Sequence, residues 1–134
     1  MKSFFCMAAL ALVGLATADF TSGNLVILTV GDGNPTVTGN MPMSLHEYTT
    51  ARGFVRSISL AGLAGGRNVT CEYGERSEGG MQLSGDGRFL MFCGYDIAPR
   101  SATYDKFLTP RVIGRISFND TITLSNTFVP MAGD

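Results

Sequence analysis

An all-β fold is predicted for this chain of 134 residues by two features of its sequence. Apolar residues alternate with polar ones in short segments that are rich in β-branched and aromatic side chains, a pattern typical of half-buried strands. Glycine, proline, asparagine or aspartate bounds each segment, and these residues form turns. Beyond residue 18, no ten-residue window has the apolar spacing of a helix.

The first element is an apolar leader. Lys2 precedes the uninterrupted apolar stretch FFCMAALALVGLA, and Ala16 and Ala18 are the small residues that signal peptidase requires. This order predicts a secretory signal peptide over residues 1–18 and an exported β-repeat domain over residues 19–134. An uncleaved anchor helix is the alternative. We expect the mature chain to be secreted or held at the cell surface, without spanning the membrane.

Eight strands are expected after the leader. In chain order the segments are NLVILTV (24–30), MSLHEYT (43–49), FVRSISL (54–60), NVTCEY (68–73), MQLS (81–84), RFLMFCGY (88–95), RVIGRISF (111–118) and TITLS (121–125). Three connections are short enough for hairpins, namely TTARG, Gly85-Asp86-Gly87 and Asn119-Asp120. The other connections are longer loops that contain glycine, proline and serine.

The arrangement of these strands repeats. The same order of elements occurs over residues 24–60 and again over residues 88–125, about 60 residues further on. In both segments a strand is followed by a long loop, and the loop by two strands joined by a turn. Repeated antiparallel sheets of about four strands that stack face to face are the blades of a β-propeller. We therefore expect about two blades of an incomplete propeller, because a closed ring needs at least about four. A small β-sandwich is the alternative.

Short motifs occur in a fixed order along the exported part. They are GNLVILTVGDG (23–33), EYTTARG (47–53), VRSISL (55–60), SEG (77–79), SGDGRFL (84–90) and GYD (94–96). Together they resemble a family of secreted, largely uncharacterised β-propeller-type repeat proteins, mostly bacterial. The resemblance covers most of residues 19–134 and implies export and a propeller fold, but no catalytic residues. Two residues depart from the motifs of this family: Arg52 lengthens one turn, and Phe89 replaces the usual tyrosine. The chain also stops where relatives continue with further blades, so we expect it to be an N-terminal, truncated portion of such a protein.

Charge and motif content exclude several classes of function. The formal net charge is −1 at pH 7 and no basic block is present, which argues against binding to nucleic acid. His46 is the sole histidine and no G-x-S-x-G motif accompanies it, so no serine-hydrolase site is predicted. One histidine without C-x-x-C spacing argues against zinc. No metal or other cofactor is predicted.

Glu78 and Asp96 are the candidate ligand-binding residues. Glu78 precedes the MQLS strand, whose start would face the central channel of a propeller, where a carboxylate can bind a cation or transfer a proton. Asp96 follows a strand and is the candidate for the second carboxylate that a glycan-cleaving enzyme needs. For both residues a role in a turn is the alternative.

Two kinds of covalent modification are also predicted. Cys71 and Cys93 remain after signal cleavage, and export permits a disulfide between them, with two buried thiols as the alternative. Asn68 and Asn119 begin N-x-[ST] sequons and are glycosylation sites if the source is eukaryotic. Asn119 is the better acceptor because it lies in a predicted turn.

The sequence therefore predicts an exported binding or scaffold module whose extracellular partner is a glycan or a protein. This expectation follows from fold analogy. An extracellular glycan-acting hydrolase or lyase that requires a complete propeller is a second hypothesis. A non-functional truncated product is a third.

Overall fold

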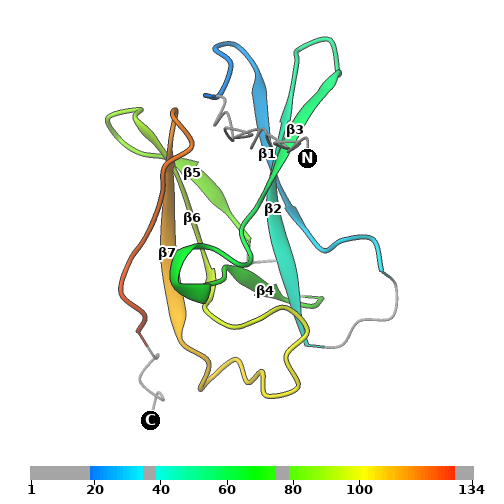
Figure 1. Ribbon diagram of the computed structural model, residues 1–134, viewed down its shortest axis with the longest axis vertical. Coiled ribbons are helices and arrows are strands. Elements are labelled where there is room, and N and C mark those ends of the chain that lie inside the picture. The colour runs from blue at the N-terminus through cyan, green and yellow to red at the C-terminus, as the bar shows by residue number, and fades with distance from the viewer. Residues whose placement is uncertain (1–18, 35–38, 75–78, 129–134) are drawn as a thin grey trace, which may run out of the picture.

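The computed structural model describes residues 19–34, 39–74 and 79–128. Within these residues the chain forms strands and one short 3₁₀ turn, so the all-β prediction is confirmed (Figure 1). The elements are β1 (Leu25–Val30), β2 (Asn40–Tyr48), β3 (Phe54–Ser59), the turn η1 (Ala64–Gly66), β4 (Thr70–Glu72), β5 (Met81–Leu83), β6 (Phe89–Tyr95), β7 (Arg111–Ser117) and β8 (Ile122–Leu124). The predicted leader and Glu78 lie outside the described residues.

The strands form one antiparallel sheet that divides into two meanders. Its order is β1-β2-β4-β6-β7-β8, with β3 paired to β2 and β5 paired to β6. On one edge of β2, residues 40–42 pair with β4 and residues 44–48 pair with β3. On one edge of β6, Tyr95 pairs with Thr70 of β4, and β5 pairs with residues 90–92. The first meander (β1–β3) and the second meander (β5–β8) are thus joined through β4, as Figure 1 shows.

The hairpin turns lie where the sequence predicts them. After β2, the backbone N–H of Thr49 donates to the carbonyl oxygen of Gly53 at 2.8 Å, and Arg52 has a φ of 69°. Gly87 has a φ of 69° between β5 and β6, and Asp120 has a φ of 60° between β7 and β8. Glycine adopts this left-handed conformation without strain, and aspartate adopts it more readily than most residues.

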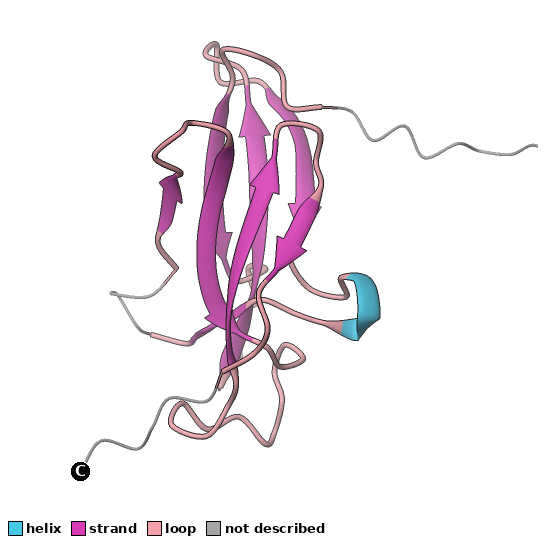
Figure 2. Ribbon diagram, turned by 90° about the vertical axis from the view of Figure 1, so that its left-hand side faces the viewer, coloured by secondary structure: helices cyan, strands magenta, loops and turns pink. Residues whose placement is uncertain are grey.

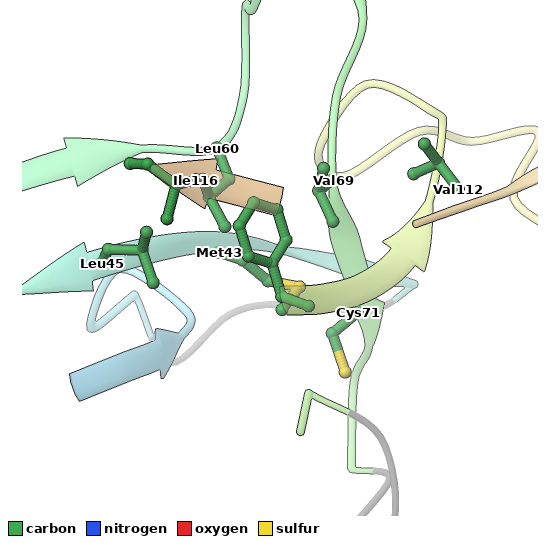
Figure 3. Packing of buried hydrophobic residues seen from close by; sticks show 8 residues of the cluster. Met43, Leu45, Leu60, Val69, Cys71, Val112 and Ile116 are labelled. Carbon is green, nitrogen blue, oxygen red and sulfur yellow. The ribbon is translucent and has the colours of Figure 1, made fainter. Parts of the chain in front are cut away.

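The two meanders pack their apolar faces against each other. Burial alternates along β2 and β7, because successive side chains of a strand point to opposite faces. The buried cluster (Figure 3) contains residues from both meanders and from β4: Met43, Leu45, Leu60, Val69, Cys71, Phe92, Val112 and Ile116. Each large apolar side chain buried in this way contributes about 1.5–3 kcal/mol, so the shared core holds the meanders together.

Two glycines allow close approach between strands. Gly114 of β7 is paired with Phe92 of β6, and a Cβ atom at Gly114 would lie 2.2 Å from an atom of the phenylalanine ring. A Cβ atom at Gly94 would lie 2.4 Å from the carbonyl oxygen of Thr70, where β4 meets β6. Glycine at these positions therefore permits the inward packing of Phe92 and the junction of the two meanders.

The first meander differs from the predicted four-stranded unit. The strands β5 to β8 are consecutive and antiparallel, whereas β4 pairs with β2 and not with β3. The reason is that β2 begins at Asn40, before the predicted start at Met43, and its additional residues pair with β4. The two meanders face each other across the core, but they belong to one hydrogen-bonded sheet.

Candidate functional site

Asp96 lies directly after β6, where its carboxylate holds the loop between β3 and β4. Its Oδ2 accepts a hydrogen bond from Arg67 Nε at 2.8 Å, and its Oδ1 accepts one from the backbone N–H of Asn68 at 2.8 Å. This loop contains η1, which projects from the side of the strands (Figure 2). Both carboxylate oxygens have protein partners, so the arrangement supports a structural role for Asp96. Its pairing with Glu78 stays a prediction.

No disulfide joins Cys71 to Cys93 in the part of the chain that the structure describes, so the predicted bridge is absent. Cys71 belongs to the buried core cluster. Cys93 follows Phe92, whose side chain is also in the core, and is exposed. By strand alternation the side chain of Cys93 therefore points to the outer face, away from that of Cys71.

The two sequons have different surroundings. The side-chain amide of Asn68 accepts a hydrogen bond from the N–H of Gly62 at 2.9 Å and donates one to the carbonyl oxygen of Gly66 at 3.1 Å. The third residue of that sequon, Thr70, is fully buried. Asn119 is exposed in the turn between β7 and β8. This difference favours Asn119 as the acceptor, and glycosylation of either residue stays a prediction.

An ionic cluster that was not predicted joins the two meanders at the end of the core away from β4. Glu47 of β2 is 1% exposed, and its Oε2 lies 2.7 Å from Nε of Arg56 of β3. Arg56 also donates to both carboxylate oxygens of Asp120, with Nη2 2.9 Å from Oδ1. The guanidinium carbon lies 4.7 Å from the ring centroid of Phe20, a cation–π contact. We call Glu47, Arg56 and Asp120 the Glu47 cluster.

The residues that follow the predicted cleavage point complete this cluster. The backbone N–H of Thr21 and the side-chain amide of Asn24 donate to Oε1 of Glu47 at 2.8 Å and 2.7 Å. The backbone N–H of Phe20 donates to the carbonyl oxygen of Phe118 at 2.9 Å. The start of the expected mature chain is therefore bonded to both meanders.

Hydrogen bonds keep Glu47 ionised in the core. Burial alone would raise the pKa of Glu47, but donors from Arg56, Thr21 and Asn24 outweigh it and lower the pKa from 4.5 to about 2. Hydrogen bonding to Asp120, opposed by burial, raises the pKa of Arg56 above its ordinary value. Glu47 and Arg56 therefore form an ion pair at neutral pH.

Residue parity provides the sequence signal for this pair. In the segment MSLHEYT, Glu47 is two residues from Leu45, and in FVRSISL, Arg56 is two residues from Ile58. Side chains two residues apart share a face, so both charged residues lie at core-facing positions of one hairpin. The register places Glu47 directly opposite Arg56. Opposite charges at inward positions of neighbouring strands are the signal that could have identified the pair.

A pocket of about 570 Å³ opens beside the Glu47 cluster. Its apolar walls include Val26, Leu90 and Ile116, and its polar rim includes Asp19 and Arg88. Apolar walls with a few polar groups at the rim are typical of sites for small ligands. The pocket lies between the start of the expected mature chain and the second meander.

The outer face of the first meander carries a patch that we call the aromatic face. It consists of Leu25, Ile27, His46, Tyr48 and Phe54. In the register, Leu25 is opposite Tyr48 and Ile27 is opposite His46. The ring centroid of Phe54 lies 5.6 Å from that of Tyr48 and 6.0 Å from that of His46. The sole histidine is thus part of an aromatic contact group on the surface of the sheet.

The described residues offer neither a metal-binding cluster nor a membrane-spanning helix, and no known protein matches the chain. Among residues 19–34, 39–74 and 79–128, no three or more His, Cys, Asp or Glu side chains form a group that could hold a metal ion. The helical structure in these same ranges is too short to cross a bilayer. No protein-family model, curated protein or solved structure matches the chain.

Proposed function

We propose that this protein is exported and acts outside the cell or at its surface as a binding or scaffold module. Its outer sheet faces stack against those of a second copy of the chain. The partner in this proposal is a protein. The N-terminal leader and the resemblance to secreted propeller-type proteins support the proposed location.

Exposed apolar side chains on both outer faces carry this proposal. On the aromatic face, Leu25 is 55% exposed and Phe54 is 59% exposed. On the outer face of the second meander, Met91 and Ile113 are exposed as well. Large exposed apolar patches on soluble proteins mark interaction surfaces. An apolar sheet face of this kind can pack against the face of another sheet.

The packing of the two meanders against each other shows how such sheets can stack. The two meanders already cover each other through the core cluster, one sheet face against another. In a propeller each four-stranded blade covers the next in the same way. The four consecutive strands of the second meander support this comparison. We infer that the outer faces repeat the packing that the inner faces have.

Sedimentation velocity over a range of concentrations tests the proposal. We expect the chain lacking residues 1–18 to associate as its concentration rises. The double variant Ile27→Ser/Phe54→Ser is expected to weaken association by about tenfold or more, because it removes two apolar contacts. Phe107→Ser is the control, since this exposed phenylalanine lies on a different element.

Two results would count against stacking. The first is a wild-type chain that stays monomeric at every concentration, because its aromatic face then does not mediate self-association. An equal loss in the Phe107→Ser control would show that the effect does not depend on that face. Export is tested separately by fusing residues 1–18 to a reporter, whose secreted form is expected to begin at Asp19.

A further inference from the structure

The loop between β6 and β7 presents two adjacent apolar side chains at one end of the molecule. Phe107 and Leu108 are 67% and 68% exposed, more than the other exposed large apolar side chains of the described residues. In Figure 1 this loop lies at the bottom, at the end away from the turn between β2 and β3. We call Lys106, Phe107 and Leu108 the loop tip.

The backbone of the loop tip makes its hydrogen bonds within the loop. The N–H of Phe107 donates to Oδ1 of Asp105 at 2.8 Å. The N–H groups of Leu108 and Thr109 donate to the backbone carbonyl oxygen of Asp105 at 3.2 Å and 2.7 Å. The N–H of Asp105 donates to the hydroxyl of Thr109 at 3.1 Å. The N–H groups of Asp105, Phe107, Leu108 and Thr109 therefore have acceptors within the loop.

Lys106 places a positive charge beside the two apolar side chains. Its Nζ lies 5.5 Å from the ring centroid of Phe107 and 3.8 Å from Oε2 of Glu72. A lysine next to inserted apolar side chains can keep its ammonium group at the polar level of a membrane while its stem contacts the apolar layer.

We propose that the loop tip inserts Phe107 and Leu108 into the outer part of a lipid bilayer, with Lys106 at the level of the lipid phosphates. A bilayer offers no hydrogen-bond acceptors below its headgroups, so an inserted loop must satisfy its own amides. The two residues proposed to insert meet this requirement, because the N–H groups of Phe107 and Leu108 both donate to Asp105. A protein partner would not impose it, because a protein can supply acceptors of its own.

Apolar insertion, and not charge attraction, drives this association. The formal net charge of the chain is −1, so anionic lipid has no general attraction for it. Neutral phosphatidylcholine bilayers are therefore the membranes that the loop tip should bind. The loop tip and the aromatic face share no residue, so this association and sheet stacking can be tested independently.

Co-sedimentation with phosphatidylcholine vesicles tests the proposal. The chain lacking residues 1–18 contains every described strand, and we expect a measurable fraction of it to sediment with vesicles. The double variant Phe107→Ser/Leu108→Ser is expected to lower the partition coefficient by about tenfold or more. The matched control is Leu83→Ser, which removes a 52% exposed leucine from β5, outside both the loop tip and the aromatic face, and is expected to leave the partition coefficient unchanged.

A spectroscopic measurement locates the inserted residue. The chain contains no tryptophan, so Leu108→Trp introduces a single fluorescent reporter at the loop tip. Its emission is expected to shift to shorter wavelength when vesicles are added, whereas that of Leu83→Trp is expected to stay unchanged. Circular dichroism of each variant confirms that the fold is retained.

Four results would overturn the proposal. The first is a wild-type chain that does not sediment with vesicles at any lipid concentration. The second is an equal loss of binding in Leu83→Ser and in the loop-tip double variant. The third is an unchanged Leu108→Trp spectrum in the presence of vesicles. Binding to anionic vesicles alone would likewise exclude the apolar mechanism.

Discussion

Replacing Arg56 by methionine would leave the Glu47 carboxylate in the core without its cation. Methionine keeps an apolar stem at this position but removes the 2.7 Å contact with Glu47 and the hydrogen bonds to Asp120. Glu47 would retain two donors, the backbone N–H of Thr21 and the side-chain amide of Asn24. These donors satisfy one carboxylate oxygen, and the other loses its partner.

The expected loss of stability is about 3 kcal/mol. Removing one partner of a buried ion pair typically costs about 3–5 kcal/mol. The carboxylate itself limits the cost, because it can take up a proton. Protonating a group with an ordinary pKa of 4.5 at pH 7 costs about 3 kcal/mol, at about 1.4 kcal/mol for each pH unit. This is a large share of the roughly 5–15 kcal/mol that stabilises a typical domain.

Urea denaturation of the chain lacking residues 1–18, followed by circular dichroism, measures this loss. With an m-value of about 1–3 kcal/mol per molar urea, the midpoint of Arg56→Met should fall by about 1–3 M. Arg88→Met is the control, because Arg88 is 73% exposed and lies 4.0 Å from Asp86. Such an exposed pair contributes at most about 1 kcal/mol.

A second variant separates the unpaired charge from the lost packing. Adding Glu47→Gln to Arg56→Met removes the charge and keeps an acceptor for Thr21 and Asn24, so most of the lost stability should return. Two outcomes would refute the reasoning. One is equal destabilisation by Arg56→Met and Arg88→Met, and the other is a double variant that is no more stable than Arg56→Met alone.

The remaining predictions concern acid and core packing. The pKa of Glu47 is lowered from 4.5 to about 2 in the folded chain, so its stabilising contribution of about 3 kcal/mol is present above pH 4.5 and is lost as the pH falls through about 2. The urea midpoint should therefore fall less steeply with acidification in Glu47→Gln than in the wild type, and parallel curves would contradict this. Gly114→Ala places a methyl group 2.2 Å from a ring atom of Phe92 and should cost about 1–3 kcal/mol. Gly80→Ala, where a Cβ atom has no neighbour within 4 Å, is the control, and equal melting temperatures of the two variants would argue against the close packing.

The strands and turns could be predicted because their signals are local. Alternation along the segment RVIGRISF is sufficient to place β7 and to separate its inner face from its outer face. Turn residues such as Gly87 and Asp120 lie between two strands that are close in sequence. The start of β2 at Asn40 is the exception, because it depends on pairing with β4.

Contacts between distant elements could not be predicted in the same way. Parity brings Glu47 and Arg56 together, but Asp120 is 64 residues from Arg56, and no local pattern indicates that its turn lies beside β3. The disulfide prediction depends on the number of cysteines and on export. Whether Cys71 and Cys93 share a face depends on the register between β4 and β6, which the sequence does not reveal.

The short strand β4 pairs with β2 of the first meander and with β6 of the second. Its pairing with β6 is confined to Thr70 and Tyr95. The hydroxyl of Thr70 also donates to the carbonyl oxygen of Tyr95 at 3.1 Å, and both residues are buried. If either meander unfolded, β4 would lose one of its two neighbouring strands. We therefore expect both meanders to unfold in one cooperative transition. A fragment that contains only one meander would expose an unpaired strand edge and the apolar face that the other meander covers. Such a fragment would be prone to aggregate.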